Sequence, residues 1–236
     1  MLSIAYQFGI SLDALQAANP KVDPHFMGEG LKLIIPISGG TAEDLPTPTP
    51  LPVHSELPKC YPSGDGGEWC IVALRNDLEA SLENLSAGIG LYNLQGEIIA
   101  SQVAYAPMNI LRPGDTIPLM AYFAPPLPDE FQVQSEVLSG LSVAAGDTRY
   151  LDLQVKVGTV VINQDGSQAV LSGDIIIPDG TPDFSQLWAL AVAYDSNGDI
   201  IGARKWKSGG EPHFDITVYS LAGKIDHVEV LNEARP

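Results

Sequence analysis

Residues 91–100 read LYNLQGEIIA, and residues 193–202 read AYDSNGDIIG. In both segments an apolar stretch leads to a tyrosine, a turn containing a glycine follows, and an Ile-Ile pair leaves the turn. Asn197-Gly198 suits the positive φ angles of a type I′ turn, and Gln95-Gly96 stands at the matching place. Each segment therefore predicts a β-hairpin, and their gapless match predicts two related β units in the chain.

Around these hairpins, residues 57–236 contain strand-length apolar runs separated by turn residues, without a helical period. Hairpin turns dominate, so the sheets are expected to be mostly antiparallel. Each half of this region has about 90 residues, the size of a seven-stranded sandwich. We therefore predict a mainly β protein with tandem antiparallel β-sandwiches, domain 1 over residues 57–145 and domain 2 over residues 146–236. The predicted strands are 71–74, 85–92, 97–103, 117–123, 131–138, 151–162, 169–177, 187–194, 199–206, 213–219 and 225–231.

The two copies of the repeat differ in where their large side chains lie. Large residues alternate from Trp188 to Tyr194 in the second copy, whereas Gly88 and Gly90 occupy the matching positions of the first. Either both are central strands covered on both sides, or a bulge shifts the register of one. In either case the alternation of Trp188 with apolar neighbours predicts that this tryptophan belongs to a core.

Composition limits the classes of partner. The chain has 236 residues, which favours two or three small units, and its 45% hydrophobic content supplies real cores. Lys+Arg 12 against Asp+Glu 29 gives a net charge of −17, which repels phosphate backbones and anionic lipids. No apolar run approaches the roughly 20 residues that a membrane-spanning helix needs. We therefore expect no nucleic-acid partner and no membrane insertion.

The only cysteines, Cys60 and Cys70, flank a glycine-rich stretch that can fold back as a hairpin loop. One closely spaced pair without other thiols predicts a disulfide in an oxidising compartment, and the alternative is two reduced thiols. No export signal is visible after Met1, so a secreted protein implies that this chain is a fragment.

The segment 38–56 is rich in proline and threonine, which favours polyproline II and predicts an extended linker. The residues before it show helical spacing. Ser11 is a candidate N-cap for a helix over residues 12–18, which Asn19-Pro20 ends. A shorter helical turn is predicted at residues 4–8, and residues 31–35 form a β-prone run.

Three stretches in this first part resemble a LysM module: SIAYQFGISLDALQAANP at residues 3–20, VDP at 22–24 and GLKLIIP at 30–36. The resemblance covers residues 1–37 and implies a small α+β unit of the βααβ type. It also implies binding of N-acetylglucosamine polymers, chiefly peptidoglycan or chitin. The family's first strand would precede Ser3, so the module is expected to lack it, leaving residues 31–35 without a strand partner.

The resemblance also implies where the glycan binds. In the family, the sugar lies in a groove between the loop after the first strand and the loop after the second helix, of which only the second is expected here. Main-chain amides and carbonyls of that loop contact its acetamido group. The alternative is a rigid turn that has no ligand and whose apolar residues pack on the helices. The implied contact residues are Asn19, Pro20, Val22, Asp23, Pro24, His25, Phe26 and Met27.

The stretches IGLYN at residues 89–93 and AVAYD at 191–195 resemble the FxLYD type of bacterial sandwich domain, although both lack its phenylalanine. This second resemblance implies immunoglobulin-like, extracytoplasmic domains without established catalytic residues.

Residue spacings typical of a catalytic or metal site are not found, so no catalytic residue, metal ligand or cofactor is predicted. The four histidines are scattered, and neither a His-Glu-x-x-His nor a Gly-x-Ser-x-Gly pattern occurs. His213 and Asp215 share one strand face, which is usual for an exposed sheet face.

Two further groups of residues were candidates for binding. Asp195, Asn197 and Asp199 resemble part of a calcium loop, but Trp206 stands where the bidentate glutamate would be, and a hairpin turn explains them fully. Trp69 and Trp206 lie near glycines and charges and are candidate stacking platforms for sugars.

The sequence thus predicts a noncatalytic, extracellular or cell-wall-associated protein that binds peptidoglycan or another N-acetylglucosamine polymer. Its sandwiches would act as spacer or adhesion domains, with another surface protein as a second partner. Two alternatives remain. The first is an enzyme: the sandwiches are the accessory region of a secreted cell-wall hydrolase, or they contain a carboxylate-pair glycosidase among the 29 acidic residues. The second is a purely structural surface protein.

Overall fold

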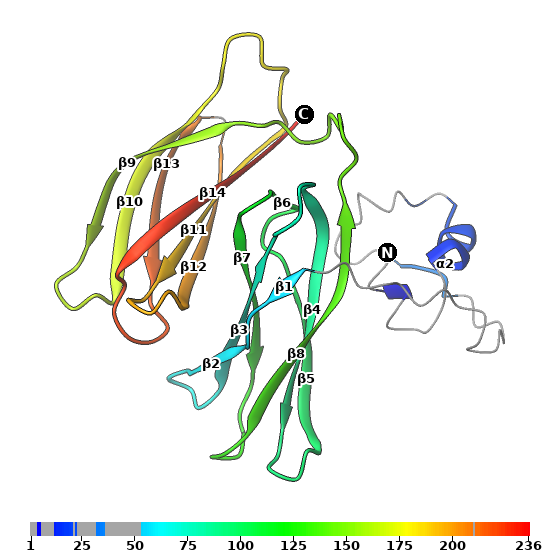
Figure 1. Cartoon of the computed structure of the whole chain (residues 1–236), viewed down its shortest axis with the longest axis vertical. Helices are drawn as coiled ribbons and strands as arrows, with labels where there is room; N and C mark the ends of the chain where they lie inside the picture. Colours follow the sequence, from blue (N-terminus) through cyan, green and yellow to red (C-terminus); the bar gives the residue numbers. More distant parts are fainter. Residues whose placement is uncertain (1–3, 6–11, 21, 23–31, 36–52, 210) are drawn as a thin grey trace. The chain divides into compact units, whose positions relative to one another are not determined.

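The computed structural model describes residues 4–5, 12–20, 22, 32–35, 53–209 and 211–236. The chain divides into two compact units, Met1–Leu51 and Pro52–Pro236. Helix occurs among the described residues only in the first unit, whereas the second consists of strands in several antiparallel sheets (Figure 1). The protein is therefore mainly β, as predicted.

The first unit contains α2 (Leu12–Ala18), which has the predicted bounds. Residues 4–5 are helical, while the rest of the predicted helical turn 4–8 lies outside the described residues. Ala5 and Leu15 are buried and form the centre of a small apolar cluster, because their positions place them on inward faces of the two helical segments. The side chains packed against them are Ile4, Leu12, Val22, Leu33 and Ile35.

The described strands of the second unit form four sheets, two before and two after the predicted boundary near residue 145 (Figure 1). In the first sheet, β3 is central and pairs with the other three strands. The first sheet consists of β1 (His54–Ser55), β2 (Lys59–Pro62), β3 (Glu68–Arg75) and β7 (Thr116–Phe123). In the second sheet, β4 is central. The second sheet consists of β4 (Leu82–Tyr92), β5 (Ile98–Tyr105), β6 (Ile110–Leu111) and β8 (Gln132–Ser142).

The third and fourth sheets have three strands each, and their inner faces contribute to one hydrophobic cluster. The third sheet has the order β12 (Ile200–Lys207), β11 (Gln186–Tyr194), β14 (His227–Arg235). The fourth sheet has the order β13 (His213–Tyr219), β10 (Gln168–Ile176), β9 (Gln154–Ile162).

Each of the eleven predicted strands corresponds to a strand of the structure. Three strands were missed: β1, which falls inside the predicted linker, β2 and β6. All three are two to four residues long. Such strands carry too few residues for a periodic signal and exist because a longer neighbour supplies their hydrogen-bond partners.

The turn of the first repeated hairpin is braced by the side chain of Asn93. The N–H of Gly96 donates to the Asn93 carbonyl at 3.0 Å. The side-chain oxygen of Asn93 accepts hydrogen bonds from the N–H groups of Gln95 at 3.0 Å and Glu97 at 2.9 Å. The short polar side chain therefore supplies acceptors that the reversing backbone lacks.

The second repeated hairpin has the same turn. The Asp195 carboxylate accepts from the N–H groups of Asn197 at 2.8 Å and Asp199 at 2.9 Å. Gly198 has a φ of 86°, but Asn84 is the one non-glycine residue with positive φ among the described residues. A type I′ turn requires positive φ at both central residues, and Asn197 does not have it. The type I′ prediction is therefore wrong. Each hairpin has a type I turn followed by a left-handed glycine.

Both hairpins also contain a bulge at the same place in the repeat. The register shifts between Leu91 and Tyr92 in the β4–β5 pair, and between Ala193 and Tyr194 in the β11–β12 pair. A bulge leaves one residue unpaired and increases the local twist. The internal repeat is confirmed at these two hairpins, and the bulge does not shift one copy relative to the other.

Strand β11 is buried on both faces, which was one of the two alternatives. Ala189, Ala191 and Ala193 face the cluster shared by the third and fourth sheets. Leu190 and Val192 point to the opposite face and are also buried. The large residues that alternate along this strand therefore lie on its second face, and the alanines lie in the core between the sheets.

We expect Gly96→Ala and Gly198→Ala each to lower the free energy of unfolding by about 1 kcal/mol, because a Cβ disfavours the left-handed backbone. Nothing lies within 4 Å of the site where either Cβ would stand, so the loss is a backbone effect. Urea denaturation measures it.

The matched control is Gly64→Ala, since Gly64 lies in a turn, has no positive φ and also has open space around it. This change should be neutral or slightly stabilising. Equal losses at all three positions would contradict the role assigned to the positive φ angle.

Candidate functional site

The first described residue of the predicted glycan loop, Asn19, uses every polar group of its side chain within the protein. Its Nδ2 donates to the carbonyls of Leu15 at 2.7 Å and Ile34 at 2.8 Å. Its Oδ1 accepts from the N–H of Ile34 at 2.8 Å. Asn19 is only 7% exposed. Its main-chain N–H donates to the Gln16 carbonyl at 2.9 Å, and its carbonyl accepts from Val22. Asn19 therefore positions the turn through both its side chain and its main chain.

Residues 32–35 belong to no strand, although their side chains alternate between exposed and partly buried. The Asn19 amide bonds both backbone groups of Ile34, as a neighbouring strand would. No strand pairs with residues 32–35 among the described residues. At Ile34 the side chain of Asn19 supplies the hydrogen bonds instead.

The other described residues of the loop have opposite orientations. Pro20 is exposed, whereas Val22 packs against the Ala5–Leu15 cluster. The N–H of Val22 donates to the carbonyl of Asn19 at 3.0 Å and closes the turn. The predicted contacts Asp23, Pro24, His25, Phe26 and Met27 lie outside the described residues.

The predicted disulfide Cys60–Cys70 is confirmed, and it links directly opposite residues of β2 and β3. We call residues 53–145 the N-terminal half of the second unit and residues 146–236 its C-terminal half. The hairpin that the disulfide closes contacts the C-terminal half. The Tyr61 hydroxyl donates to the Ile200 carbonyl at 3.0 Å, and Lys59 forms an ion pair with Asp199. Burial, followed by the nearby carboxylates, raises the pKa of Tyr61 to about 12.

A buried carboxylate lies on the second face of the third sheet. Glu233 is 0% exposed and stands opposite Trp188 in the β11–β14 register, so the two share a face. Its oxygens accept from the N–H and side-chain amide of Asn109, both at 2.6 Å, and from the Gln186 amide at 2.7 Å. Because Asn109 belongs to the N-terminal half, that half covers this face.

Two cations extend the same contact. Arg112 donates to the carbonyls of Asn232 at 2.6 Å and Leu151 at 3.1 Å, and Lys205 donates to the carbonyl of Pro107 at 2.6 Å. The sheets before and after residue 145 are therefore joined by partly buried polar bonds within the second unit.

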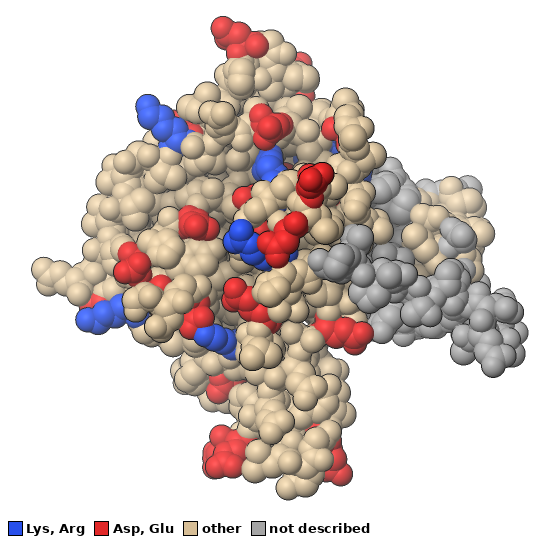
Figure 2. All heavy atoms as spheres, in the orientation of Figure 1, with Lys and Arg blue, Asp and Glu red and all other residues tan. Residues whose placement is uncertain are grey.

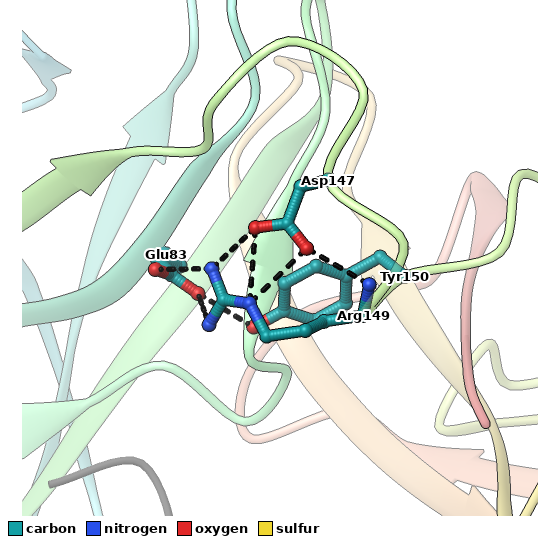
Figure 3. Close-up of polar contacts among 4 residues, drawn as sticks. All are labelled: Glu83, Asp147, Arg149 and Tyr150. Atoms are coloured by element: carbon teal, nitrogen blue, oxygen red, sulfur yellow. Dashed lines mark hydrogen bonds and ion pairs between the residues drawn. The ribbon is translucent and has the colours of Figure 1, made fainter.

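The segment between β8 and β9 is held by four residues, Glu83, Asp147, Arg149 and Tyr150, which we call the linker clamp. Figure 3 shows the Arg149 guanidinium between the two carboxylates. It donates three hydrogen bonds to Asp147, of 2.6, 3.0 and 3.1 Å, and two of 2.9 Å to Glu83. The Tyr150 hydroxyl donates to Glu83 at 2.9 Å. These bonds raise the pKa of Arg149, and burial is the main reason that the pKa of Tyr150 is raised.

A cavity of about 490 Å³ lies beside the linker clamp. Its lining includes Asp147, Tyr150, Glu79, Arg112 and Asp152. Asp147 is already paired with Arg149, and the Nε of Arg112 lies 3.5 Å from Asp152. The charged groups here therefore serve mainly to join the two halves.

The predicted tryptophan platforms are partly buried. The ring of Trp69 lies 5.1 Å from that of Tyr122, and the ring of Trp206 lies 6.1 Å from that of Phe214. Trp206 also lines a second cavity, at the edge of the third and fourth sheets. Trp188 is half-buried on the second face of its sheet.

The remaining candidates have structural roles. The Asp195 carboxylate braces its turn and Asp199 pairs with Lys59, so both of these candidate calcium ligands bond groups of the protein itself. His213 lies 3.8 Å from Asp215 and 2.9 Å from Asp174 on an exposed sheet face. The hydrogen bond with Asp174 raises the pKa of His213.

Figure 2 shows acidic side chains spread over the visible face, with fewer basic ones among them. This distribution agrees with the net charge of −17. A surface of this sign favours uncharged or cationic partners, because it repels polyanions.

No protein-family model matches the chain, and no curated protein gives a significant match to it. Among the described residues, no helix is long and apolar enough to cross a membrane, and no three His, Cys, Asp or Glu side chains are grouped to hold a metal ion. The function is therefore inferred from the chain's own residues.

Arg149→Met should lower the free energy of unfolding by about 2–3 kcal/mol, because Glu83 is 5% exposed and would lose its charged partner. Chemical denaturation of the full chain measures this loss. Arg75→Met is the matched control, since the Arg75–Asp77 pair has both side chains 52% exposed and should contribute less than about 1 kcal/mol. Equal effects of the two changes would contradict the clamp.

Lys205 predicts a pH effect on stability. Its Nζ lies 2.9 Å from the centroid of the Trp188 ring, and burial lowers its pKa to about 8, with Glu233 partly opposing. Between pH 8 and about 10 the unfolded state binds more protons here, so this residue makes stability rise with pH. Relative to Lys205→Met, the chain should gain unfolding free energy over this window. A constant difference would contradict the lowered pKa.

Proposed function

We propose that this chain is a noncatalytic extracellular protein that binds a polymer containing N-acetylglucosamine, such as peptidoglycan, through a LysM-like segment. Residues 19–27 form the binding loop. Residues 57–145 and 146–236 form two immunoglobulin-like β-sandwiches of the FxLYD type, which act as a spacer and present the chain to another surface protein.

The observation that carries the glycan role is the bonding of Asn19. Its three side-chain hydrogen bonds hold the end of α2 against residues 32–35. A turn fixed in this way loses little entropy when it binds a ligand, and the acetamido group of the sugar would be bound by main-chain groups of the residues that follow Asn19. Exposed Pro20 keeps one side of the turn open and stiff.

The spacer role is supported by the bonds between the two halves of the second unit. A buried carboxylate, the linker clamp and two cation–carbonyl contacts resist bending at the joint. Charged groups bonded in a buried joint are costly to separate. A stiff spacer is useful where a binding segment has to be held away from its carrier.

The extracellular location is supported by the disulfide, since such bonds persist in oxidising compartments.

Retention of the full chain on insoluble peptidoglycan tests the glycan role. We expect retention, with release by soluble N-acetylglucosamine oligomers. Asn19→Ala should reduce the retained fraction about tenfold or more, because it removes three hydrogen bonds that hold the loop. Asn93→Ala, which removes a similar turn-bracing amide from the second unit, should bind normally.

Two results would reject the glycan role. One is that the unaltered chain is not retained. The other is that the soluble oligomers fail to release it, which would point to adsorption by charge or apolar contact.

A further inference from the structure

A second recognition site is built where the third and fourth sheets meet at one edge. Strand β12 pairs only with β11, and β13 pairs only with β10, among the described residues. Residues 203–207 and 213–217 therefore present unpaired backbone groups toward each other. A cavity of about 470 Å³ lies between them, which is within the usual range for a ligand site.

One end of this cleft is closed by the backbone. The N–H of Leu221 donates to the carbonyl of Ile201 at 2.7 Å. Gly202 lies so close to the Tyr219 carbonyl that a Cβ would collide with it. The two strands thus touch at this end, so a bound segment has to stop there.

The register decides which side chains enter the cleft. Arg204 and Trp206 pair with Ala191 and Ala189, whose side chains lie in the shared core, so both point between the sheets. Trp206 packs on that core, whereas Arg204 is exposed and makes no hydrogen bond or ion pair with any described residue. The cleft therefore has an apolar floor and one unpaired cation.

Lys205, Lys207 and Asp215 also line the cavity, but they belong to the outward faces of their sheets. Asp215 pairs with Ser172 on the outer face of the fourth sheet and lies near His213. Lys205 and Lys207 lie over the Trp188 ring on the second face of the third sheet. Of these four charged residues, Arg204 is the one whose register directs its side chain between the sheets.

We propose that this cleft binds the C-terminal end of an extended peptide, which adds as a strand to β12. Its backbone pairs with the free edge of β12, an apolar side chain rests on Trp206, and its terminal carboxylate bonds Arg204. Strand addition supplies the affinity through main-chain hydrogen bonds, and the guanidinium supplies the selection for a carboxylate.

The closed end of the cleft fixes the direction in which the bound peptide runs along β12. Gly202 lies near the start of β12, so a strand running antiparallel to β12 reaches the closed end with its C-terminus. Antiparallel pairing is the more stable arrangement. Arg204 lies two residues from Gly202, about 7 Å along the strand, so the negative terminus arrives within reach of its guanidinium.

This proposal does not rest on the glycan role, because its residues and those of the predicted glycan loop belong to different units. Asn19→Ala should leave it unchanged.

The test is a titration of the isotope-labelled full chain with acetyl-Thr-Val-Thr-Val-Leu as the free acid and as the C-terminal amide, followed by backbone amide NMR shifts. The shifts should map to residues 203–207 and 213–219. The acid should bind about tenfold more tightly than the amide, the value of one charge-assisted hydrogen-bond pair. Arg204→Gln should bind both equally, whereas Lys224→Gln, an exposed cation outside the cleft, should keep the preference.

Several results would overturn the proposal. These are no binding of the acid peptide, equal binding of acid and amide by the unaltered chain, a preference that survives in Arg204→Gln, or shifts that map elsewhere. If trigalacturonate displaced the peptide at a concentration below that of the peptide itself, the cleft would be assigned to acidic sugars instead.

Discussion

Burial of the third sheet on both faces is the constraint on which the second unit depends. Alanines on the inner face of β11 allow the fourth sheet to approach closely, and the larger Leu190 and Val192 are left on the other face. That face would expose a large apolar patch if nothing covered it. Glu233 lies on it as well, and a buried carboxylate is tolerated only with donors, which Asn109 and Gln186 provide. The C-terminal half thus requires the N-terminal half.

One local device supports both units. Asn93, Asp195 and Asn19 each use a short polar side chain to satisfy backbone groups that no helix or strand partner reaches. In the hairpins this fixes a turn and the bulge beside it. In the first unit it bonds both backbone groups of Ile34, which has no strand partner among the described residues. Such side chains compete with regular structure, so they stand where it ends.

The two proposed binding sites rely on the same physics. In both proposals, at the loop after α2 and at the edge of β12, the ligand is bound through main-chain donors and acceptors. Recognition of this kind selects shape and hydrogen-bonding pattern, and the charge at Arg204 adds selection for a carboxylate. A joint stiffened by the linker clamp suits a protein whose role is to hold binding segments at a distance, since it resists bending between the two halves.

The helix Leu12–Ala18, the longer strands and the glycines of the turns were determined by the sequence alone, because apolar spacing and turn chemistry act over a few residues. The disulfide was predictable from spacing for the same reason. The short strands, the second buried face of β11 and the positions of Arg149 and Arg204 were decided by the tertiary structure. Each depends on which distant segment pairs with or covers which strand, and local periodicity carries no record of that pairing.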